Sequence, residues 1–376
     1  MKVLVVTTSY PDRPGAQRGI FIRELCRALT GKGAEVMVVT PRVDPSSPLR
    51  ENDQGIEVRR FTYPTGGRRL HQTESIPVFP MAVFMVSGLA STLRAVRSFR
   101  PDVIHGNWIV PTGLIASIAG LSSLTPVVNT ARGMDTRLRK NPAVWPLFDL
   151  AVRLSGRVTV VSEAMRAIPG LEAAEVIPSG IKDQFFEVSP DPSSQTVLYT
   201  RSLEPVYGAD TIIRSIPHVL EKAPGARFVI AGTGSLAGHL EAMASELGVR
   251  DRVTFLGHVP HESVPALLSE SRVFVSTATE DGTSVALMEA MAAGLIPVAT
   301  DIAPNRTLIE HETDGFLFRP KDAPGLALMI TRALSGEIRE EAIASKRADL
   351  KRRIPWSVVA DRFVLGYNQL LERSRR

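Results

Sequence analysis

Short runs of β-branched and other apolar residues alternate, along almost the whole chain, with longer segments whose apolar residues recur at helical spacing. This alternation is typical of buried parallel strands that are connected by crossover helices. It therefore predicts α/β sheets in both halves of the chain. The runs predicted to be strands are KVLVVT, EVMVVT, DVIH, PVVNT, RVTVV and EVIP in the first half, and TVLYT, ARFVIAG, RVTFLG, RVFVST and IPVAT in the second.

The alternation is interrupted once, at the segment SGIKDQFFEVSPDPSSQ, where Pro, Ser and Asp cluster with little periodicity. We interpret residues near 180–195 as a linker, because a chain of 376 residues is too long for one ordinary core. The pattern predicts two Rossmann-like, doubly wound domains, residues 1–185 and residues 186–355. A final helix over 356–376 either caps the second domain or lies back on the first.

The composition is that of an ordinary soluble protein, with 44% hydrophobic and 22% charged residues. The single cysteine, Cys26, excludes a disulfide framework and a cysteine-rich metal site, and it is predicted to pack in the core. The opening MKVLVVTTSYP has no cleavage-site pattern and is predicted to be the first strand. The apolar stretch IPVFPMAVFMVSGLA contains two prolines and is shorter than the roughly 18 residues of a membrane-spanning helix. A cytoplasmic location is therefore expected.

The net charge of +5 is unevenly distributed. Residues 1–185 hold 23 Lys and Arg against 15 Asp and Glu, whereas the remainder holds 21 against 24. A basic first half favours a nucleic acid, an anionic membrane surface or an acidic substrate as partner, or it is a solvated surface without a partner. Among the basic segments, PMAVFMVSGLASTLRAVRSFR has the apolar and basic mixture of an interfacial helix, although such a helix also packs on sheets.

The segment FVIAGTGSLAG matches the dinucleotide fingerprint in its G-x-G-x-x-A form. The acid expected at the end of the next strand is missing, since RVTFLGH ends in Gly257 and His258. We therefore expect no nicotinamide cofactor. Gly232 and Gly234 still predict a loop that can approach a nucleotide or phosphate at a helix N-terminus.

The segment TEDGTSVALMEAMAAG, residues 279–294, places a polar cluster where a strand is followed by a helix. Backbone N–H groups at the start of this helix favour an anion, although Thr283 or Ser284 can equally be a simple N-cap. Asp281 is suited to accept hydrogen bonds from sugar hydroxyls, and Glu289 can hold a second pair of hydroxyls. The residues predicted to surround the anion are Gly282, Thr283, Ser284 and Val285.

This segment resembles the paired-acid signature of the retaining glycosyltransferases of family 4, the glycosyl transferases group 1. Asp281 stands at the first acid and Glu289 at the second, and the likeness continues through IPVATDIAPNRTLIEHETDGFLF. The segments VIPSGIKDQFF and VLYTRSLEPVYGADTII resemble the start of the family's second domain. Arg201 stands where the family has an arginine on the donor diphosphate, and Tyr207 replaces the companion lysine.

Segments of the first half extend the resemblance. The loop GAQRGIFIRELCRAL resembles the family's glycine-containing loop, with Gly19 at the start of the helix. The segment IHGNWIVPTG carries His105 and Asn107 where a His pair is frequent, and NTARGMD carries Arg132 where the family has a His.

The resemblance implies a GT-B fold, two Rossmann-like domains that face each other across a cleft. The first domain would bind the acceptor, the second the nucleotide sugar, and the helix 356–376 would cross back to the first. The implied reaction is retaining transfer of a hexosyl unit from a nucleoside diphosphate sugar to a glycan or lipid-linked acceptor, in envelope or exported polysaccharide synthesis, with no cofactor. No Asp-x-Asp motif occurs, so no metal is expected. The implied catalytic residues are Asp281, Arg201 and Arg132, and the implied substrate-binding residues are Glu289, Gly282, Thr283, Ser284, Val285, Gly19, His105, Asn107, Gly232, Gly234 and His258.

Two other functions fit parts of the sequence. A sugar-nucleotide 2-epimerase has the same fold and binds a nucleotide sugar without an acceptor. A basic nucleic-acid-binding protein fits the charge, but aromatic residues make up only 6% of the chain and no recognition module is present. We therefore expect no nucleic acid partner, and the membrane contact would be peripheral, on the inner face of the cell membrane.

Overall fold

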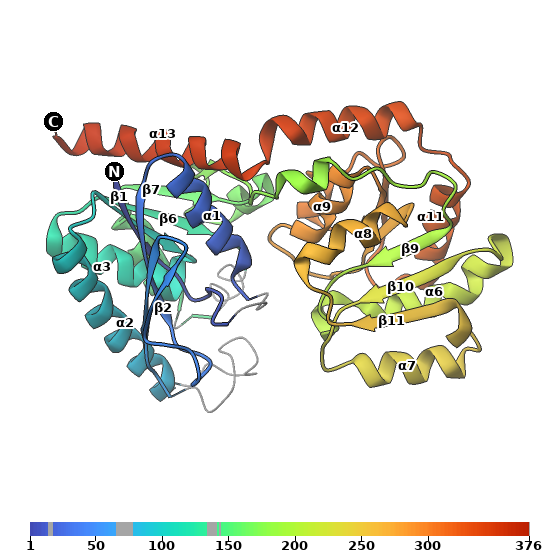
Figure 1. The fold of residues 1–376 in the computed structure, drawn as a ribbon, viewed down its shortest axis with the longest axis horizontal. Helices are drawn as coiled ribbons and strands as arrows, with labels where there is room; N and C mark the ends of the chain where they lie inside the picture. Colours follow the sequence, from blue (N-terminus) through green and yellow to red (C-terminus); the bar gives the residue numbers. More distant parts are fainter. Residues whose placement is uncertain (14–17, 65–77, 134–140, 143, 376) are drawn as a thin grey trace. The chain divides into compact units, whose positions relative to one another are not determined.

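The computed structural model describes residues 1–13, 18–64, 78–133, 141–142 and 144–375. The chain divides into two compact units (Figure 1). The first unit comprises Met1–Gly180 together with Trp356–Arg376, and the second comprises Ile181–Pro355. Each unit contains one sheet, and each is described separately.

The first sheet has eight strands in the order β3-β4-β2-β1-β5-β6-β7-β8, and only the β3–β4 pair is antiparallel. The second sheet has six parallel strands in the order β11-β10-β9-β12-β13-β14. The strand bounds are β1 (Lys2–Val6), β2 (Glu35–Pro41), β3 (Arg50–Asp53), β4 (Ile56–Phe61), β5 (Val103–Asn107), β6 (Val127–Ala131), β7 (Arg157–Val160), β8 (Glu175–Val176), β9 (Thr196–Tyr199), β10 (Arg227–Ala231), β11 (Val253–Gly257), β12 (Val273–Ser276), β13 (Ile296–Thr300) and β14 (Phe316–Phe318).

Every strand predicted from the alternation is present. The structure adds β3, β4 and β14, which the sequence pattern did not predict. Strands β3 and β4 form an edge hairpin: exposed and half-buried residues alternate along β3, and buried and half-buried residues alternate along most of β4. Strand β14 has only three residues. Neither pattern resembles the continuous apolar run of a buried parallel strand.

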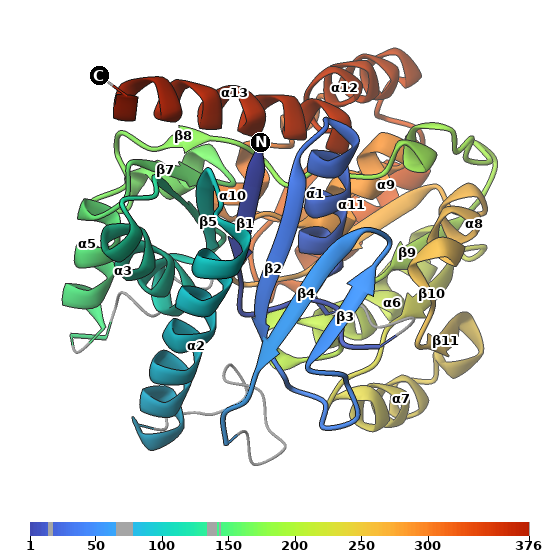
Figure 2. The same ribbon diagram turned by 60° about the vertical axis from the view of Figure 1, so that its left-hand side comes forward.

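Helices cover both faces of the first sheet (Figure 2). Side chains alternate across a strand, so Val3 and Val5 of β1 face one layer while Leu4 and Val6 face the other. The layer against Val3 and Val5 contains α1 (Ile20–Gly31) and α13 (Trp356–Arg375), and Cys26 is buried in its core as predicted. The opposite layer contains α2 (Val78–Phe99), α3 (Leu114–Ser123) and α5 (Trp145–Arg153).

The second sheet is covered in the same way. One face carries α6 (Ala209–Lys222), α7 (Ala237–Glu246) and α11 (Ala323–Leu334). The other carries α8 (Val264–Ser269), α9 (Val285–Ala293) and α12 (Glu340–Arg353), and the short α10 (Ala303–Arg306) follows β13. Both sheets therefore have the doubly wound architecture predicted from the sequence.

The expected linker near 180–195 is wrong in part. Ile181, Phe185 and Phe186 are buried in the core of the second unit, so the chain changes unit at residue 180 rather than 185. The chain leaves the second unit at Pro355, which forms a β-bridge with Ile181. The Ile181 amide also donates to the Ile354 carbonyl at 2.9 Å, so the two ends of the second unit are joined.

Helix α2 is longer than the sequence analysis allowed. It runs for 22 residues from Val78 and includes Pro80, so by length and composition it is the one helix among the described residues that could cross a bilayer. One side of the helix is nevertheless buried against the sheet, through Phe84, Gly88 and Ala95. It is therefore part of the first unit's own layer.

Candidate functional site

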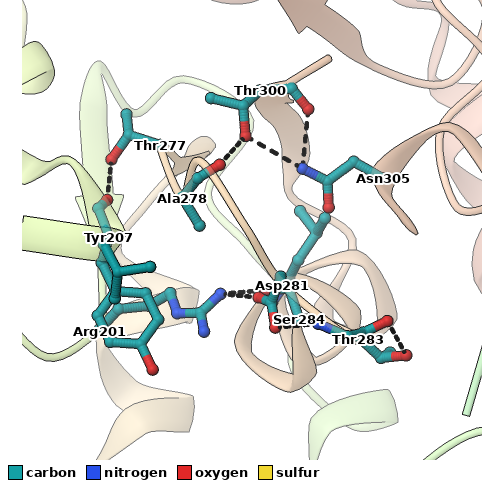
Figure 3. Close-up of polar contacts among 12 residues, drawn as sticks. Arg201, Tyr207, Thr277, Ala278, Asp281, Thr283, Ser284, Thr300 and Asn305 are labelled. Carbon is teal, nitrogen blue, oxygen red and sulfur yellow. Dashed lines mark hydrogen bonds and ion pairs between the residues drawn. The ribbon is translucent and has the colours of Figure 1, made fainter. Parts of the chain in front are cut away.

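The strand order of the second sheet reverses between β9 and β12. From β9 the chain continues to β10 and β11 on one side, and from β12 it continues to β13 and β14 on the other. Open α/β sheets bind ligands at such a switch point, outside the carboxyl ends of the strands. Arg201 follows β9 and Asp281 follows β12. The two residues thus come from the two loops that flank the switch point (Figure 3).

The start of α9 lies in the loop after β12. Ser284 is the N-cap, and its buried hydroxyl oxygen accepts a hydrogen bond from the Leu287 amide at 3.3 Å. The helix itself supplies no acceptor for the amides of Val285 and Ala286, because they occupy its first turn. This end of the helix therefore has the positive potential that favours an anion.

Arg201 is held against this helix start. Its Nη1 atom donates to Asp281 Oδ2 and, at 3.0 Å, to Ser284 Oγ. Burial disfavours the charged guanidinium, but the Asp281 carboxylate beside it outweighs this effect and raises the pKa of Arg201 above its usual value. Arg201 is therefore a permanent cation at the predicted anion site.

Asp281 is already satisfied within the unit. Besides the ion pair with Arg201, its Oδ1 atom accepts from the Gly282 amide at 2.8 Å. The Thr283 hydroxyl donates to the Gly282 carbonyl at 2.8 Å, and this closes the turn before α9. The carboxylate predicted to hold sugar hydroxyls is thus occupied by protein donors in this structure.

Tyr207 supports Arg201 from the other side. The Arg201 guanidinium carbon lies 4.3 Å from the centre of the Tyr207 ring, a cation–π contact. The Tyr207 carbonyl accepts from Thr277 Oγ1 at 2.7 Å, and a Cβ atom on Gly208 would lie only 2.6 Å from the Thr277 carbonyl oxygen. The loops after β9 and β12 are therefore packed directly against each other.

A second contact fixes the loop after β12 to β13. The Thr300 hydroxyl donates to the Ala278 carbonyl at 2.6 Å, and Asn305 Nδ2 donates to the Thr300 carbonyl at 2.8 Å (Figure 3). These hydrogen bonds hold the backbone that leads to Asp281.

Glu289 lies one turn beyond Val285, on the same face of α9. It is 6% exposed, and its Oε1 atom is 2.7 Å from His261 Nε2. His261, in the short helix His261–Ser263 after β11, was not predicted from the sequence. Its Nδ1 atom is buried and has no hydrogen-bond partner in the part of the chain that the structure describes. The one feature of the sequence that could have indicated His261 is its position shortly after the carboxyl end of a predicted strand.

The glycines of the fingerprint-like loop have a packing role. A Cβ atom on Gly232 would lie 2.1 Å from the Arg201 carbonyl oxygen, and one on Gly234 would lie 2.4 Å from the Leu203 carbonyl. The Leu203 amide donates to the Thr233 carbonyl at 2.9 Å. The loop therefore supports the backbone beside Arg201. His258 is exposed, and no contact joins it to Arg201 or Asp281 among the described residues.

His105 corrects one prediction in the first unit. Its side chain is fully buried, with Nδ1 2.7 Å from the Tyr367 hydroxyl and Nε2 2.7 Å from the Thr130 hydroxyl. Burial, followed by the charge of Arg132, lowers its pKa to about 3. His105 is a neutral core residue that joins β5 to α13, and in this structure it has no atom to offer a substrate.

The corresponding switch point of the first sheet lies between β1 and β5. Asn107 is the last residue of β5, and Arg132 follows the neighbouring strand β6. Arg132 Nε donates to Asn107 Oδ1 at 2.8 Å, and Arg132 Nη1 donates to Ser179 Oγ at 3.3 Å. The guanidinium lies 5.1 Å from the centre of the Phe21 ring, in the first turn of α1. Asn107 Nδ2 is buried without a hydrogen-bond partner among the described residues.

Gly19 precedes α1 with a left-handed backbone (φ 70°), and a Cβ atom there would lie 2.5 Å from the Ser9 carbonyl. It therefore permits the close turn between the loop after β1 and the helix. The end of the NTARGMD motif, from residue 134 on, lies outside the described residues. Within the described ranges, no group of three or more His, Cys, Asp and Glu side chains is placed to hold a metal ion.

Known proteins share this architecture. The structure of Anabaena HepE in complex with UDP superposes with a TM-score of 0.74 at 19% identity, over 98% of this chain and all of that one. Two doubly wound sheets with a polar site at the switch point of the second thus define a protein of the GT-B class. The chain belongs to the glycosyl transferases group 1 family. The model of that family matches residues 181–351, and the glycosyl transferase 4-like domain matches residues 19–173.

Two curated relatives match over almost the whole of this chain. An uncharacterised glycosyltransferase of Methanocaldococcus jannaschii is 26% identical over the whole of both chains. A GDP-mannose-dependent alpha-(1-6)-phosphatidylinositol monomannoside mannosyltransferase of Mycobacterium tuberculosis is 23% identical over 96% of both chains. The chain is therefore similar to glycosyltransferases from end to end.

Proposed function

We propose that this glycosyltransferase moves a hexosyl unit from a nucleoside diphosphate sugar to a glycan or lipid-linked acceptor, with retention of the anomeric configuration. The observation that carries the proposal is the placement of the Arg201 guanidinium at the N-terminus of α9, 3.0 Å from the N-cap hydroxyl of Ser284. A cation and a helix start together suit a diphosphate. The related mannosyltransferase is named as GDP-mannose-dependent and as acting on phosphatidylinositol monomannoside, and HepE binds UDP, which supports a donor and acceptor of these classes.

In the proposed reaction the acceptor oxygen bonds to the anomeric carbon while the bond from that carbon to the diphosphate oxygen breaks. Negative charge grows on the departing diphosphate, and Arg201 and the amides of Val285 and Ala286 stabilise it where it develops. The acceptor hydroxyl proton passes to that diphosphate, on the same face of the sugar. No separate general base is needed.

The remaining residues have binding roles in this proposal. Asp281 exchanges its contact with Arg201 for hydroxyls of the donor sugar when the diphosphate binds. Glu289, oriented by His261, accepts from the ribose hydroxyls. In the first unit, Arg132 and Asn107 are the candidates for contact with an anionic or hydroxylated part of a substrate.

We propose further that transfer requires no divalent metal, since the chain has no Asp-x-Asp motif. Envelope or exported polysaccharide synthesis is the proposed setting, and it is suggested by family resemblance alone.

The test is calorimetric titration with UDP, GDP, ADP and NAD, with and without EDTA, followed by an assay of transfer. The proposal expects saturable binding of one nucleoside diphosphate, equal in EDTA, and its loss in Arg201→Gln. Arg227→Gln, an exposed arginine on β10, is the matched control and should bind normally. Binding of NAD alone would contradict the proposal. Turnover of a nucleotide sugar without any acceptor, to an epimer, would indicate the epimerase instead.

A further inference from the structure

Exposed apolar side chains gather on one layer of the first unit. Among the described residues, thirteen large apolar side chains are exposed, and eight of them belong to α2, α3, α5 or the turn after α3. These helices have only 22, 10 and 9 residues, so exposed apolar side chains are concentrated on them rather than scattered singly over the surface. The eight are Val78, Phe79, Val86, Leu121, Leu124, Trp145, Leu147 and Leu150.

The exposed residues of α2 and α5 form outward stripes. On α2, Val78, Ala82 and Val86 are spaced four residues apart, on the side opposite the buried Phe84 and Gly88. On α5, Leu147 and Leu150 are three residues apart and exposed, whereas Phe148 and Ala151 are buried. We call the stripes of α2 and α5 together the outer face.

The two stripes belong to one surface. Met85 of α2 packs against the same core cluster as Phe148 of α5, and α3 lies between the two helices (Figure 2). Each helix leads into a parallel strand, so both begin near the carboxyl ends of the strands. The apolar ends of α2 and α5 therefore lie at the same edge of the first sheet as the loops that carry Gly19 and Arg132.

Positive charge follows the apolar residues on both helices. Arg94 and Arg97 lie near the end of α2, and Arg153 ends α5; all three are exposed. The three helices contain one acid, Asp149, which is half-buried. An apolar stripe followed by arginines, with Phe and Trp at the helix starts, is the arrangement of helices that lie in the interface of an anionic bilayer.

We propose that the outer face is a docking surface for an anionic lipid bilayer. In this proposal α2 and α5 lie on the surface of the bilayer and do not cross it. Crossing is incompatible with the fold, because the inner side of α2 packs on the sheet. A second copy of the chain fits less well. Parallel pairing of two outer faces would oppose Arg94 and Arg97 to the same residues of the copy, and antiparallel pairing would set them against apolar residues.

The outer face consists of residues of the first unit, whereas the proposed donor site consists of residues of the second. It also adds to the proposed function, since a bilayer on this face would present a lipid-linked acceptor at the edge of the sheet that carries Arg132.

The experiment is flotation of the full chain with vesicles of phosphatidylcholine alone, or of phosphatidylcholine mixed with phosphatidylglycerol, without nucleotide. The wild type should float with the mixed vesicles at low salt, much less at high salt, and not with the neutral ones. Phe79→Glu with Val86→Glu should abolish flotation. Leu247→Glu with Leu328→Glu, two exposed leucines of the second unit, is the matched control and should float as the wild type does.

A second pair of variants separates charge from apolar contact. Arg94→Gln with Arg97→Gln should weaken partition by about tenfold or more, because each cation near an anionic surface contributes about fivefold. Arg214→Gln with Arg227→Gln, exposed arginines of the second unit, should change it little. Nucleoside diphosphate titration of the same variants should be unchanged, so failure of the donor site and failure of the docking surface give different results.

Three results would overturn the proposal. The first is a wild type that does not float with anionic vesicles. The second is an equal loss of flotation in the Phe79/Val86 variant and in its Leu247/Leu328 control. The third is a stable dimer, seen by light scattering, that the Phe79/Val86 variant dissociates while no chain floats. That result would assign the outer face to a second copy.

Discussion

The Arg201 guanidinium and the Asp281 carboxylate form an ion pair within the second unit, with each side chain only 13% exposed. The two groups come from loops 80 residues apart, on either side of the switch point. A diphosphate at the N-terminus of α9 would compete with this carboxylate for the same cation. If the proposed donor binds here, the strength of the ion pair sets part of its affinity.

We expect Asp281→Asn to bind the nucleoside diphosphate more tightly than the wild type, by about threefold to tenfold, because a neutral amide competes less for Arg201. Transfer should nevertheless fall by about a hundredfold or more, since the carboxylate proposed to hold the sugar is lost. Calorimetry and a transfer assay measure the two effects. Asp210→Asn, which removes the surface partner of Arg214, should alter neither. Weaker diphosphate binding in Asp281→Asn would contradict competition.

Tyr207 is expected to act through its ring. Tyr207→Phe should bind the nucleoside diphosphate as the wild type does, because the ring over Arg201 remains. Tyr207→Ala should weaken binding by about threefold to thirtyfold, the range of a cation–π contact and the order it imposes. Titration of both variants is the measurement, and equal affinities would show that the ring does not position Arg201.

His261 is predicted to position Glu289. In His261→Phe the carboxylate loses its partner at 2.7 Å, so the KM for the nucleotide sugar should rise by about tenfold, while kcat changes less. His239→Phe, at an exposed histidine of α7, is the control and should keep both constants. A fall in kcat with unchanged KM would indicate a role in the chemical step instead.

His105 makes the first unit sensitive to acid. Burial lowers its pKa to about 3, whereas an unfolded histidine titrates near 6.5, so the unfolded chain binds the proton first. The stabilisation is present above about pH 6.5 and is lost as the pH falls toward 3, by about 1.4 kcal/mol per pH unit. Urea denaturation of the wild type and of His105→Asn should show a smaller pH dependence in the variant. His218→Asn, at an exposed histidine, should retain the dependence of the wild type.

Gly234 is expected to be irreplaceable by alanine. Its added Cβ would lie 2.4 Å from the Leu203 carbonyl, so Gly234→Ala must displace the loop beside Arg201. We expect a loss of about 1 to 3 kcal/mol in stability and weaker nucleoside diphosphate binding. Gly238→Ala, in α7 with nothing within 4 Å, should be neutral or slightly stabilising. Thermal denaturation and titration distinguish the two glycines, and equal behaviour would refute the packing role.

Much of the fold could be predicted from the sequence because buried parallel strands are apolar on both faces. Strands β1 and β12 show this directly. The edge hairpin of β3 and β4 could not be predicted in this way, since only one of its faces contacts the core. The boundary is at residue 180 rather than 185 because Ile181, Phe185 and Phe186 enter the second core, although Pro, Ser and Asp cluster around them in the sequence.

For the candidate site, the local sequence was sufficient to predict the polar start of α9. It was not sufficient to predict which residues from other loops contact it. Ser284 and Asp281 belong to one contiguous motif. The contacts of Arg201 with Asp281 and of His261 with Glu289 depend on which strands are neighbours in the sheet. For His105 the sequence predicted a substrate contact that the structure does not support. A polar residue at the end of a strand suggested a ligand, but its partners Thr130 and Tyr367 are supplied by a neighbouring strand and by the last helix.

The dependence of the first unit on the last helix has a consequence for synthesis of the chain. Trp356, Phe363 and Tyr367 of α13 complete the core that begins with β1, and the whole second unit lies between them in the sequence. The second unit, whose ends are joined by the bridge of Ile181 and Pro355, has all its residues available before α13 is translated. The domain at the N-terminus is thus the last to be completed on the ribosome, in contrast to the usual order of folding.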